Sequence, residues 1–306
     1  MTNLKLALDW TPNINHIGFF VAQEKGFYQA LDLAVELLDP AVDNYQTTPA
    51  KKVELGLADF ALCPTESMIS YRTKIQPFPL IAVAALLQED LSAITVLSDK
   101  GIKRPKDLDG KIYSSYQARY EDGIVREMIK NDGGAGNLNI TYPAKLGIWN
   151  TLLSGEADAT WIFLNWEGVE AAQSQHELTY FKLRDYHIPY SYSPVIAANA
   201  DLVETKLLYY RRFLSATKKG YLYGKDHPSE AVEILRQFVP QHDQHIDLAQ
   251  ALEQSVTYFG DEDSWGRMEE AKMKQFLQWI QDKGLEQSQI LPSELYTLLC
   301  LEPQNS

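Results

Sequence analysis

A short pattern of glycine, alanine and aspartate occurs twice in this chain, and each copy joins a helix-like segment to a strand-like one. The first copy is Gly56-Leu-Ala-Asp59 followed by Phe-Ala-Leu62, and the second is Gly155-Glu-Ala-Asp158 followed by Ala-Thr-Trp161. Glycine is typical of a helix end, and the run after the aspartate is typical of a short strand. The matches indicate either an internal repeat or a common helix-to-strand junction. Both interpretations predict α/β structure in both halves of the chain.

The first thirty residues predict a strand, a loop and a helix. Leu4, Leu6 and Leu8 alternate with other residues, residues 9–13 break the alternation, and residues 16–25 carry apolar side chains at helical spacing. We therefore expect Asp9 and Trp10 at the carboxyl end of a strand. Thr48 before Pro49 has the form of a helix N-cap. Further strands are expected over residues 33–38, 80–87, 92–97 and 192–197.

The order of these segments predicts two lobes. After residue 197 the pattern is helical: one long helix is expected from Asp201 through Leu208 and Leu214, and another begins at Pro228. If the chain leaves lobe one near residue 90 and re-enters it near 192, lobe one comprises residues 1–90 and 192–306, including the C-terminal helices, and lobe two comprises residues 91–191. Ligands of α/β sheets bind at the carboxyl ends of strands, so we expect the site in a cleft between the lobes.

Composition and missing motifs exclude several classes of protein. The 306 residues include 28 basic and 41 acidic side chains, a net charge of −13, which argues against a nucleic-acid partner. Cys63 and Cys300 have no metal-ligand spacing, and His242 and His245 have no evident third ligand, so no metal site is expected. The common phosphate-loop, dinucleotide, hydrolase and metalloprotease motifs are absent. We therefore predict no catalytic residue and no cofactor.

Aromatic and acidic residues at strand ends are the candidates for ligand binding. Glu167 follows a strand-like run beside Trp166, where a low local dielectric would strengthen its pairing with a ligand amine or amidine. Glu66 occupies the corresponding place in the first half; the alternative role for both is a helix-start glutamate. His16 is either a ligand contact or, the favoured interpretation, a first-turn helix residue. Asp9 is a further candidate, and Trp10 is the favoured aromatic contact because it stands next to Asp9 and the break at Pro12. For the other aromatic candidates a core or rim position is the favoured alternative; they are Tyr116, Trp161, Trp166 and Tyr190.

A weaker candidate is an anion site at the segment from Tyr116 to Gly123. This segment ends a predicted strand and begins a helix, so free backbone N–H groups together with Arg119 would suit an anion. Arg119 has an alternative, because it would pair equally well with Glu121 or Asp122.

The opening segment makes the chain resemble a known group of proteins. Its most specific part is Leu8-Asp-Trp-Thr-Pro-Asn13, then His16, then the segment from Val21 to Tyr28. The chain resembles the thiamin-pyrimidine-precursor substrate-binding proteins of bacterial ABC importers and the related fungal pyrimidine synthases, from Leu6 to about Leu301. Supporting matches follow in the same order: Gly56-x-Ala-Asp59, Asp107-Leu-x-Gly-Lys111, Gly155-x-Ala-Asp158 and Trp166-Glu-Gly168.

The resemblance implies the type II periplasmic-binding fold, with two lobes joined by two crossovers and the ligand cleft between them. It implies that Trp10 stacks on a pyrimidine and that Glu167 hydrogen-bonds to its ring nitrogen or amino group. The implied ligand is a hydroxymethyl- or formylaminomethyl-aminopyrimidine, bound for uptake or salvage by a monomer, with an ABC permease as a further partner.

Departures from the synthases argue against an enzyme. The lysine and histidine of the synthases correspond here to Cys63 and Ser67, and their cysteine-rich run corresponds to Tyr190-Ser-Tyr-Ser-Pro194. Their glycine-rich phosphate loop corresponds to Tyr116-Gln-Ala-Arg119. A synthase-like enzyme and a cytoplasmic sensor or carrier stay as alternatives. Met1 as the native start predicts a cytoplasmic protein, and a removed leader predicts a periplasmic or otherwise extracytoplasmic one.

Overall fold

The computed structural model describes residues 1–302, except for the side chain of Leu146, and its contacts divide the chain into two compact units. Unit 1 contains Met1–Asp90, Ser191–Met273 and the described residues from Gln289 onward, and unit 2 contains Leu91–Tyr190 and Lys274–Ser288. Two of the boundaries between the units lie at Asp90–Leu91 and Tyr190–Ser191. The segment Lys274–Ser288 also belongs to unit 2, and the boundaries expected from the sequence do not include it.

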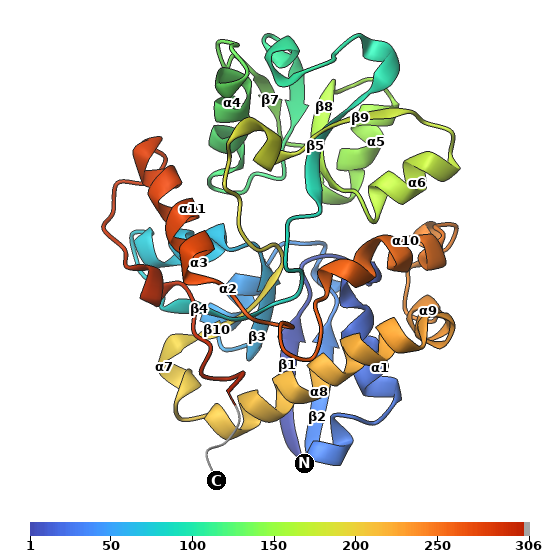
Figure 1. Ribbon diagram of the computed structural model, residues 1–306, viewed down its shortest axis with the longest axis vertical. Helices are drawn as coiled ribbons and strands as arrows, with labels where there is room; N and C mark the ends of the chain where they lie inside the picture. Colours follow the sequence, from blue (N-terminus) through green and yellow to red (C-terminus); the bar gives the residue numbers. More distant parts are fainter. Residues whose placement is uncertain (303–306) are drawn as a thin grey trace. The chain divides into compact units, whose positions relative to one another are not determined.

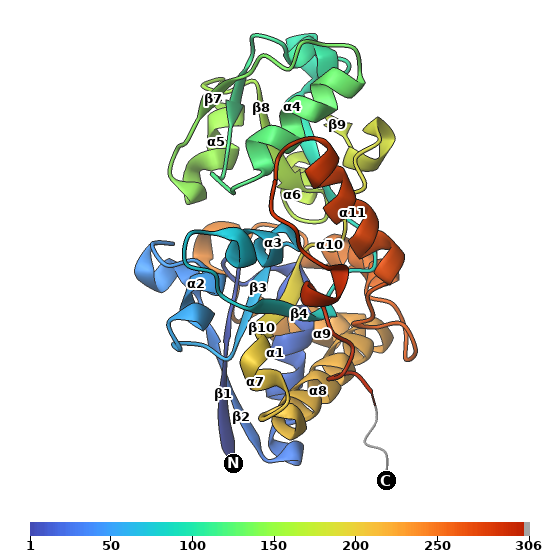
Figure 2. The same ribbon diagram turned by 90° about the vertical axis from the view of Figure 1, so that its left-hand side faces the viewer.

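In unit 1, the described residues form a five-stranded sheet in the order β2-β1-β3-β10-β4 (Figure 1). The strands are β1 (Thr2–Ala7), β2 (Leu33–Leu38), β3 (Phe60–Cys63), β4 (Leu80–Ala85) and β10 (Val195–Asn199). β1 lies parallel to β2 and β3, and β10 lies antiparallel to β3 and β4. Figure 2 shows β1 and β2 side by side, with the N-terminus at the start of β1. The loops that follow the three parallel strands therefore emerge at one edge of the sheet.

Unit 2 repeats this arrangement, with the described strands in the order β7-β6-β8-β5-β9. They are β5 (Ser92–Leu97), β6 (Ile112–Ser114), β7 (Asn139–Thr141), β8 (Ala159–Phe163) and β9 (Leu178–Phe181). β6 is parallel to both neighbours, and β5 is antiparallel to both of its own. In both sheets, therefore, the second strand in the order (β1 or β6) is parallel to its two neighbours, and the fourth strand (β10 or β5) is antiparallel to its two neighbours.

The repeated glycine–aspartate pattern leads into the third strand of each sheet, β3 in unit 1 and β8 in unit 2. In unit 1, Asp59 Oδ2 accepts a hydrogen bond from the Lys5 N–H at 3.0 Å, and the Asp59 N–H donates to the Lys5 carbonyl at 2.9 Å. In unit 2, Asp158 and Ile112 make the same two bonds, each at 2.8 Å. The pattern is therefore an internal structural repeat in which the aspartate fastens the third strand to the central one.

Helices cover the two sheets. Those of unit 1 are α1 (Ile17–Glu24), α2 (Pro49–Glu54), α3 (Glu66–Thr73), α7 (Ala200–Val203), α8 (Leu207–Asp226), α9 (Pro228–Arg236) and α10 (Leu248–Ser255). Those of unit 2 are α4 (Glu121–Asn131), α5 (Ile148–Leu153) and α6 (Glu167–Gln173), and α11 (Glu270–Asp282) continues from unit 1 into unit 2. Within residues 1–302, no helix combines the length and apolar composition needed to cross a membrane.

Local signals explain the helix boundaries. Thr48 caps α2 as expected, because its hydroxyl accepts a hydrogen bond from the Lys51 N–H at 3.3 Å. The single long helix expected from Asp201 is wrong, since α7 ends at Val203 and α8 begins at Leu207. At this break the Thr205 hydroxyl donates to the Leu202 carbonyl at 3.1 Å, a local bond that competes with the helical backbone pattern.

The core of unit 1 forms where α1 and α8 pack together, with α8 running beside α1 in Figure 1. A β-carbon at Gly220 would lie 2.0 Å from the carbonyl oxygen of Gly18, so the two helices approach more closely than any larger residue allows. The hydroxyl of the buried Tyr221 on α8 donates to the Asn15 carbonyl at 2.5 Å. The core of unit 1 thereby fixes the short turn, residues 14–16, that carries His16.

Candidate functional site

The loop after β1 places Asp9 against His16. His16 is fully buried, and its Nε2 lies 2.8 Å from Oδ1 of Asp9, whose side chain is 26% exposed. The Asn13 N–H points at Nδ1 of His16 over 3.3 Å, so Nδ1 is an acceptor and Nε2 carries the hydrogen. The imidazole therefore donates to Asp9 and orients its carboxylate. His16 ends the short turn that leads into α1, close to the helix-start position that the sequence favoured, and it contacts a predicted site residue.

Trp10 lies in the same loop and is half-buried. Its ring packs against that of Tyr45, with centroids 5.0 Å apart and planes tilted by 54°. The Tyr45 hydroxyl accepts a hydrogen bond from the Thr11 N–H at 3.2 Å, and burial raises the pKa of Tyr45 to about 12. Tyr45 thus holds both the indole of Trp10 and the backbone beside it.

Glu66 begins α3, just after the neighbouring strand β3, and is 5% exposed. It lies close to Cys63, the last residue of β3, and so does Asp9. Burial raises the pKa of the Cys63 thiol to about 12, and the charges of Asp9 and Glu66 act in the same direction. Burial and the negative charges of two carboxylates that follow β1 and β3 therefore keep the Cys63 thiol protonated.

In unit 2, the predicted residues lie around the end of β8. Glu167 is the first residue of α6, and its Oε2 accepts a hydrogen bond from the Phe163 N–H at 3.0 Å. The rings of Trp161 and Tyr190 pack with centroids 5.3 Å apart. Trp166 is only 4% exposed, so the neighbour expected to lower the local dielectric beside Glu167 is part of the packed interior of unit 2.

The loop after β6 corrects the expectation of free backbone N–H groups. The carboxylate of Glu121 accepts from the Tyr116 N–H at 3.0 Å, from the Ala118 N–H at 3.2 Å and from the Tyr113 hydroxyl at 2.7 Å. Glu121 is 3% exposed, and this burial raises its pKa. The group that accepts from these backbone N–H groups is therefore the carboxylate of Glu121, a side chain of the protein itself.

Arg119 is matched by a carboxylate that the sequence did not indicate. Its Nη2 lies 2.8 Å from Oε2 of Glu286, and the Tyr120 hydroxyl donates to the same oxygen at 2.7 Å. Glu286 is 6% exposed and belongs to the segment Lys274–Ser288 of unit 2. Glu286 is 167 residues from Arg119 in the sequence, whereas the two partners considered from the sequence, Glu121 and Asp122, are close neighbours of Arg119.

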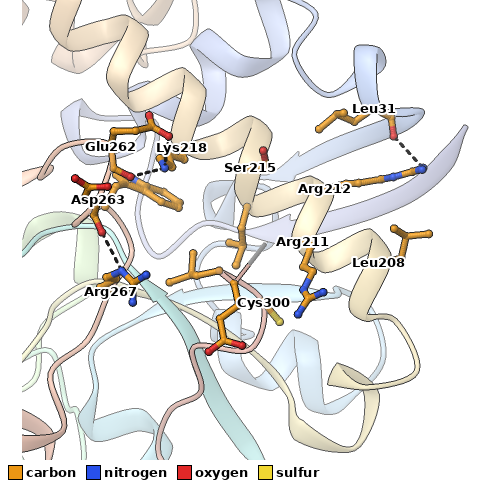
Figure 3. Close-up of a pocket in the computed structure, with 14 residues that line it drawn as sticks. Leu31, Leu208, Arg211, Arg212, Ser215, Lys218, Glu262, Asp263, Arg267 and Cys300 are labelled. Atoms are coloured by element: carbon orange, nitrogen blue, oxygen red, sulfur yellow. Dashed lines mark hydrogen bonds and ion pairs between the residues drawn. The ribbon is translucent and has the colours of Figure 1, made fainter. Parts of the chain in front are cut away.

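A groove of about 850 Å³ lies elsewhere in unit 1, between α8 and the C-terminal segment. Figure 3 shows Leu208, Arg211, Arg212, Ser215 and Lys218 projecting from α8 along it. The arginines donate to main-chain carbonyls: Arg211 to Leu299, Arg212 to Leu31 and Arg267 to Asp263. The described lining includes none of the predicted site residues, and these bonds indicate that the groove is structural. Across residues 1–302, no cluster of three or more histidine, cysteine or acidic side chains is placed to hold a metal ion.

Sequence reasoning missed Tyr45 and Glu286, and it did not indicate that Glu121 accepts hydrogen bonds from the backbone of its own loop. Tyr45 follows β2 in a left-handed conformation with φ of 60°, at the same sheet edge as the end of β1, and this parallel pairing was the available signal. The role of Glu121 was signalled by its place at the first turn of a helix after a strand. Nothing local marks Glu286.

Comparison with known proteins places the chain in a family. The family model described as NMT1/THI5 like matches residues 13–231. The chain is 25% identical to the formylaminopyrimidine-binding protein of Halalkalibacterium halodurans over 255 residues, 83% of this chain and 75% of the relative. It is 26% identical to a 4-amino-5-hydroxymethyl-2-methylpyrimidine phosphate synthase of Legionella pneumophila over 250 residues, 79% of this chain and 76% of the relative.

Among solved structures, the alkanesulfonate-binding protein SsuA of Xanthomonas axonopodis pv. citri superimposes with a TM-score of 0.73 at 10% identity. The superposition covers 97% of this chain and 98% of SsuA. The expected fold class is confirmed: the two α/β units have the periplasmic-binding-protein fold. The chain belongs to the NMT1/THI5-like family.

Proposed function

We propose that the protein binds an aminopyrimidine of the thiamin-precursor class, with a hydroxymethyl or formylaminomethyl substituent, and releases it unchanged. The observation that carries this proposal is the placement of the half-buried Trp10 next to Asp9, whose carboxylate is oriented by His16. An indole face suits a flat heterocycle, and a carboxylate oxygen suits its amino group. The similarity to a formylaminopyrimidine-binding protein supports the same ligand class.

Unit 2 supplies the second set of proposed contacts. The half-buried Glu167 at the end of β8 would accept from the ring N–H or the amino group, and Trp161 with Tyr190 would line the aromatic faces. Tyr116 and Glu66 are proposed as flanking contacts at the ends of β6 and β3. This set extends the proposal for Trp10 and Asp9 and is tested separately below.

The synthase alternative requires pyridoxal phosphate, and the residues present do not fit that group. The position that corresponds to the synthase lysine holds Cys63, which is 4% exposed and has no amine with which to hold an aldehyde. The backbone N–H groups in the loop after β6 are bonded to Glu121, so they are not available to a phosphate. Both observations support a binding protein over a synthase.

The proposal is tested by isothermal titration calorimetry of the two aminopyrimidines with the wild-type protein. We expect one-site binding, and we expect Glu167→Gln to weaken it about tenfold, because a charged acceptor is lost. Glu170→Gln, on the same helix, is the matched control and should bind like the wild type. If the protein bound neither pyrimidine, the proposal would be contradicted. If incubation with pyridoxal phosphate and iron released a pyrimidine product, that result would support the synthase alternative instead.

We further propose that the protein is a monomer that delivers its ligand to an ABC permease. The structural neighbours include binding proteins of importers, which supports this role. Light scattering coupled to size-exclusion chromatography should give a mass close to the 34.7 kDa of one chain. A mass of two chains would contradict the monomer. In membranes that contain an ABC permease from the same organism, failure of the ligand-loaded protein to stimulate ATP hydrolysis would contradict the delivery role.

A further inference from the structure

The loop between β6 and α4 has the backbone geometry that binds anions in many proteins. It joins the carboxyl end of a strand to the amino end of an eleven-residue helix, and two of its N–H groups, those of Tyr116 and Ala118, point at one carboxylate. Backbone donors and the helix dipole both favour a negative charge at such a place. The occupant is the carboxylate of Glu121, the first residue of the helix.

Glu121 fills this position as a built-in part of unit 2. Its two oxygens receive three hydrogen bonds, the third coming from Tyr113, whose side chain is fully buried. With 3% of its surface exposed, Glu121 is shielded from water and depends on these donors to stabilise its charge.

A second buried carboxylate holds the other side of the loop. Glu286 accepts from Arg119 and Tyr120 of the loop and also from the N–H groups of Gln287 and Ser288, at 2.8 and 2.9 Å. The charge of Arg119 is therefore matched within unit 2. The loop is fixed from both sides: Arg119 is bonded to Glu286, and the N–H groups of Tyr116 and Ala118 are bonded to Glu121.

We propose that Glu121 is a specificity-determining residue, whose carboxylate makes the protein accept an uncharged aminopyrimidine and reject the phosphate ester of the same heterocycle. A phosphate at this loop would meet a like charge at close range. If it displaced Glu121, the buried carboxylate would lose its donors, which is costly. This inference rests on the proposed function, and it explains in physical terms why a relative of a phosphate synthase would bind the unphosphorylated compound.

The test is calorimetric titration of hydroxymethyl-aminopyrimidine and of its phosphate ester into the same wild-type preparation. We expect the unphosphorylated compound to bind at least about a hundredfold more tightly. Glu121→Ser should reduce this affinity ratio at least about tenfold, because it removes the negative charge and leaves the N–H groups of Tyr116 and Ala118 without their carboxylate acceptor. Glu127→Ser, on the same helix but bonded to Lys130 and Lys283, should leave the ratio unchanged.

The outcomes separate this inference from the proposed function. Equal affinities for the two compounds in the wild type would overturn the inference and leave the proposed function intact, whereas binding of neither would overturn the proposed function. A folded Glu121→Ser protein with an unchanged ratio would also overturn the inference. If that variant does not fold, phosphorus NMR of inorganic phosphate with the wild-type protein tests the inference instead. We expect no saturable binding of phosphate at millimolar concentration. Saturable binding that the phosphate ester competes away would contradict the inference.

Discussion

His16 Nε2 lies 2.8 Å from Oδ1 of Asp9, and the opposite ring nitrogen of His16 accepts from the Asn13 N–H. This arrangement assigns the hydrogen to Nε2 and makes the imidazole a donor to the carboxylate. Because His16 is fully buried and Asp9 is not, the histidine fixes the orientation of an acceptor that solvent or a ligand can reach. The hydroxyl of Tyr221 on α8 donates to the Asn15 carbonyl and so holds residues 14–16, the short segment that carries His16.

Asp9→Asn is expected to weaken aminopyrimidine binding about ten- to a hundredfold, the cost of losing a charged hydrogen-bond acceptor. The amide oxygen can still accept from His16, so the outer group becomes an amide donor facing the ligand's amino group. Titration calorimetry measures the effect, with the exposed Asp99→Asn as the control. Wild-type affinity in Asp9→Asn would show that this carboxylate does not contact the ligand.

Cys63 should resist alkylation in the native protein at pH 8. The thiolate is the reactive form, and the pKa of about 12 together with 4% exposure makes it scarce and inaccessible. In a Cys300→Ser background, which leaves Cys63 as the sole thiol, iodoacetamide should react at least about a hundredfold more slowly with the folded than with the urea-unfolded chain. Equal rates, followed by mass spectrometry, would be evidence for an activated thiol and against a simple binding protein.

Gly220→Ala should lower the free energy of unfolding by about 1–3 kcal/mol or more, because a β-carbon there would collide with the Gly18 carbonyl. The matched control is Gly224→Ala on the same helix. There the new β-carbon would lie 3.5 Å from Ala231, an ordinary contact, and the higher helix propensity of alanine should keep or raise stability. Urea unfolding measures both, and equal stability of the two variants would refute the close helix approach.

Stability should fall as the pH rises above about 10. Burial raises the pKa of Tyr28, Tyr113 and Tyr221 above that of a tyrosine in the unfolded chain. A raised folded-state pKa means that the folded protein binds protons more tightly than the unfolded one, so this contribution is present below the unfolded pKa and is lost above it. Urea unfolding at pH 8, 9, 10 and 11 measures the slope, which Tyr28→Phe should reduce. A flat profile would contradict the assigned burial.

Much of the fold is predictable because it follows from the order of apolar and polar residues within short segments of the sequence. Alternation predicts β1, and the glycine–aspartate pattern predicts the strands β3 and β8. The matching hydrogen bonds of Asp59 and Asp158 are visible only in the structure. What the sequence does not show is that Lys274–Ser288 packs in unit 2. An amphipathic helix indicates that one face is buried and does not indicate which partner covers it.

In the candidate site, too, contacts between residues close in sequence are predictable, and contacts between distant residues are not. Asp9, Trp10 and His16 lie within eight residues of one another, so their proximity in a single loop is predictable from the sequence. Glu286 reaches Arg119 across 167 residues, and Tyr45 reaches Thr11 across 34, so both depend on tertiary structure. The free N–H groups expected near Tyr116 are bonded because a helix-start glutamate folds back on its own loop, which composition cannot distinguish from a surface glutamate.

The most direct test of the whole account is the affinity of Trp10→Ala for formylaminomethyl-aminopyrimidine. Loss of the indole face should weaken binding at least about tenfold, because an aromatic contact is worth about 0.5–1.5 kcal/mol beyond its buried area. Tyr223→Ala, which removes a half-buried aromatic side chain on α8 of unit 1, should bind like the wild type. Undiminished affinity in a folded Trp10→Ala protein would contradict the claim that this strand end holds the heterocycle.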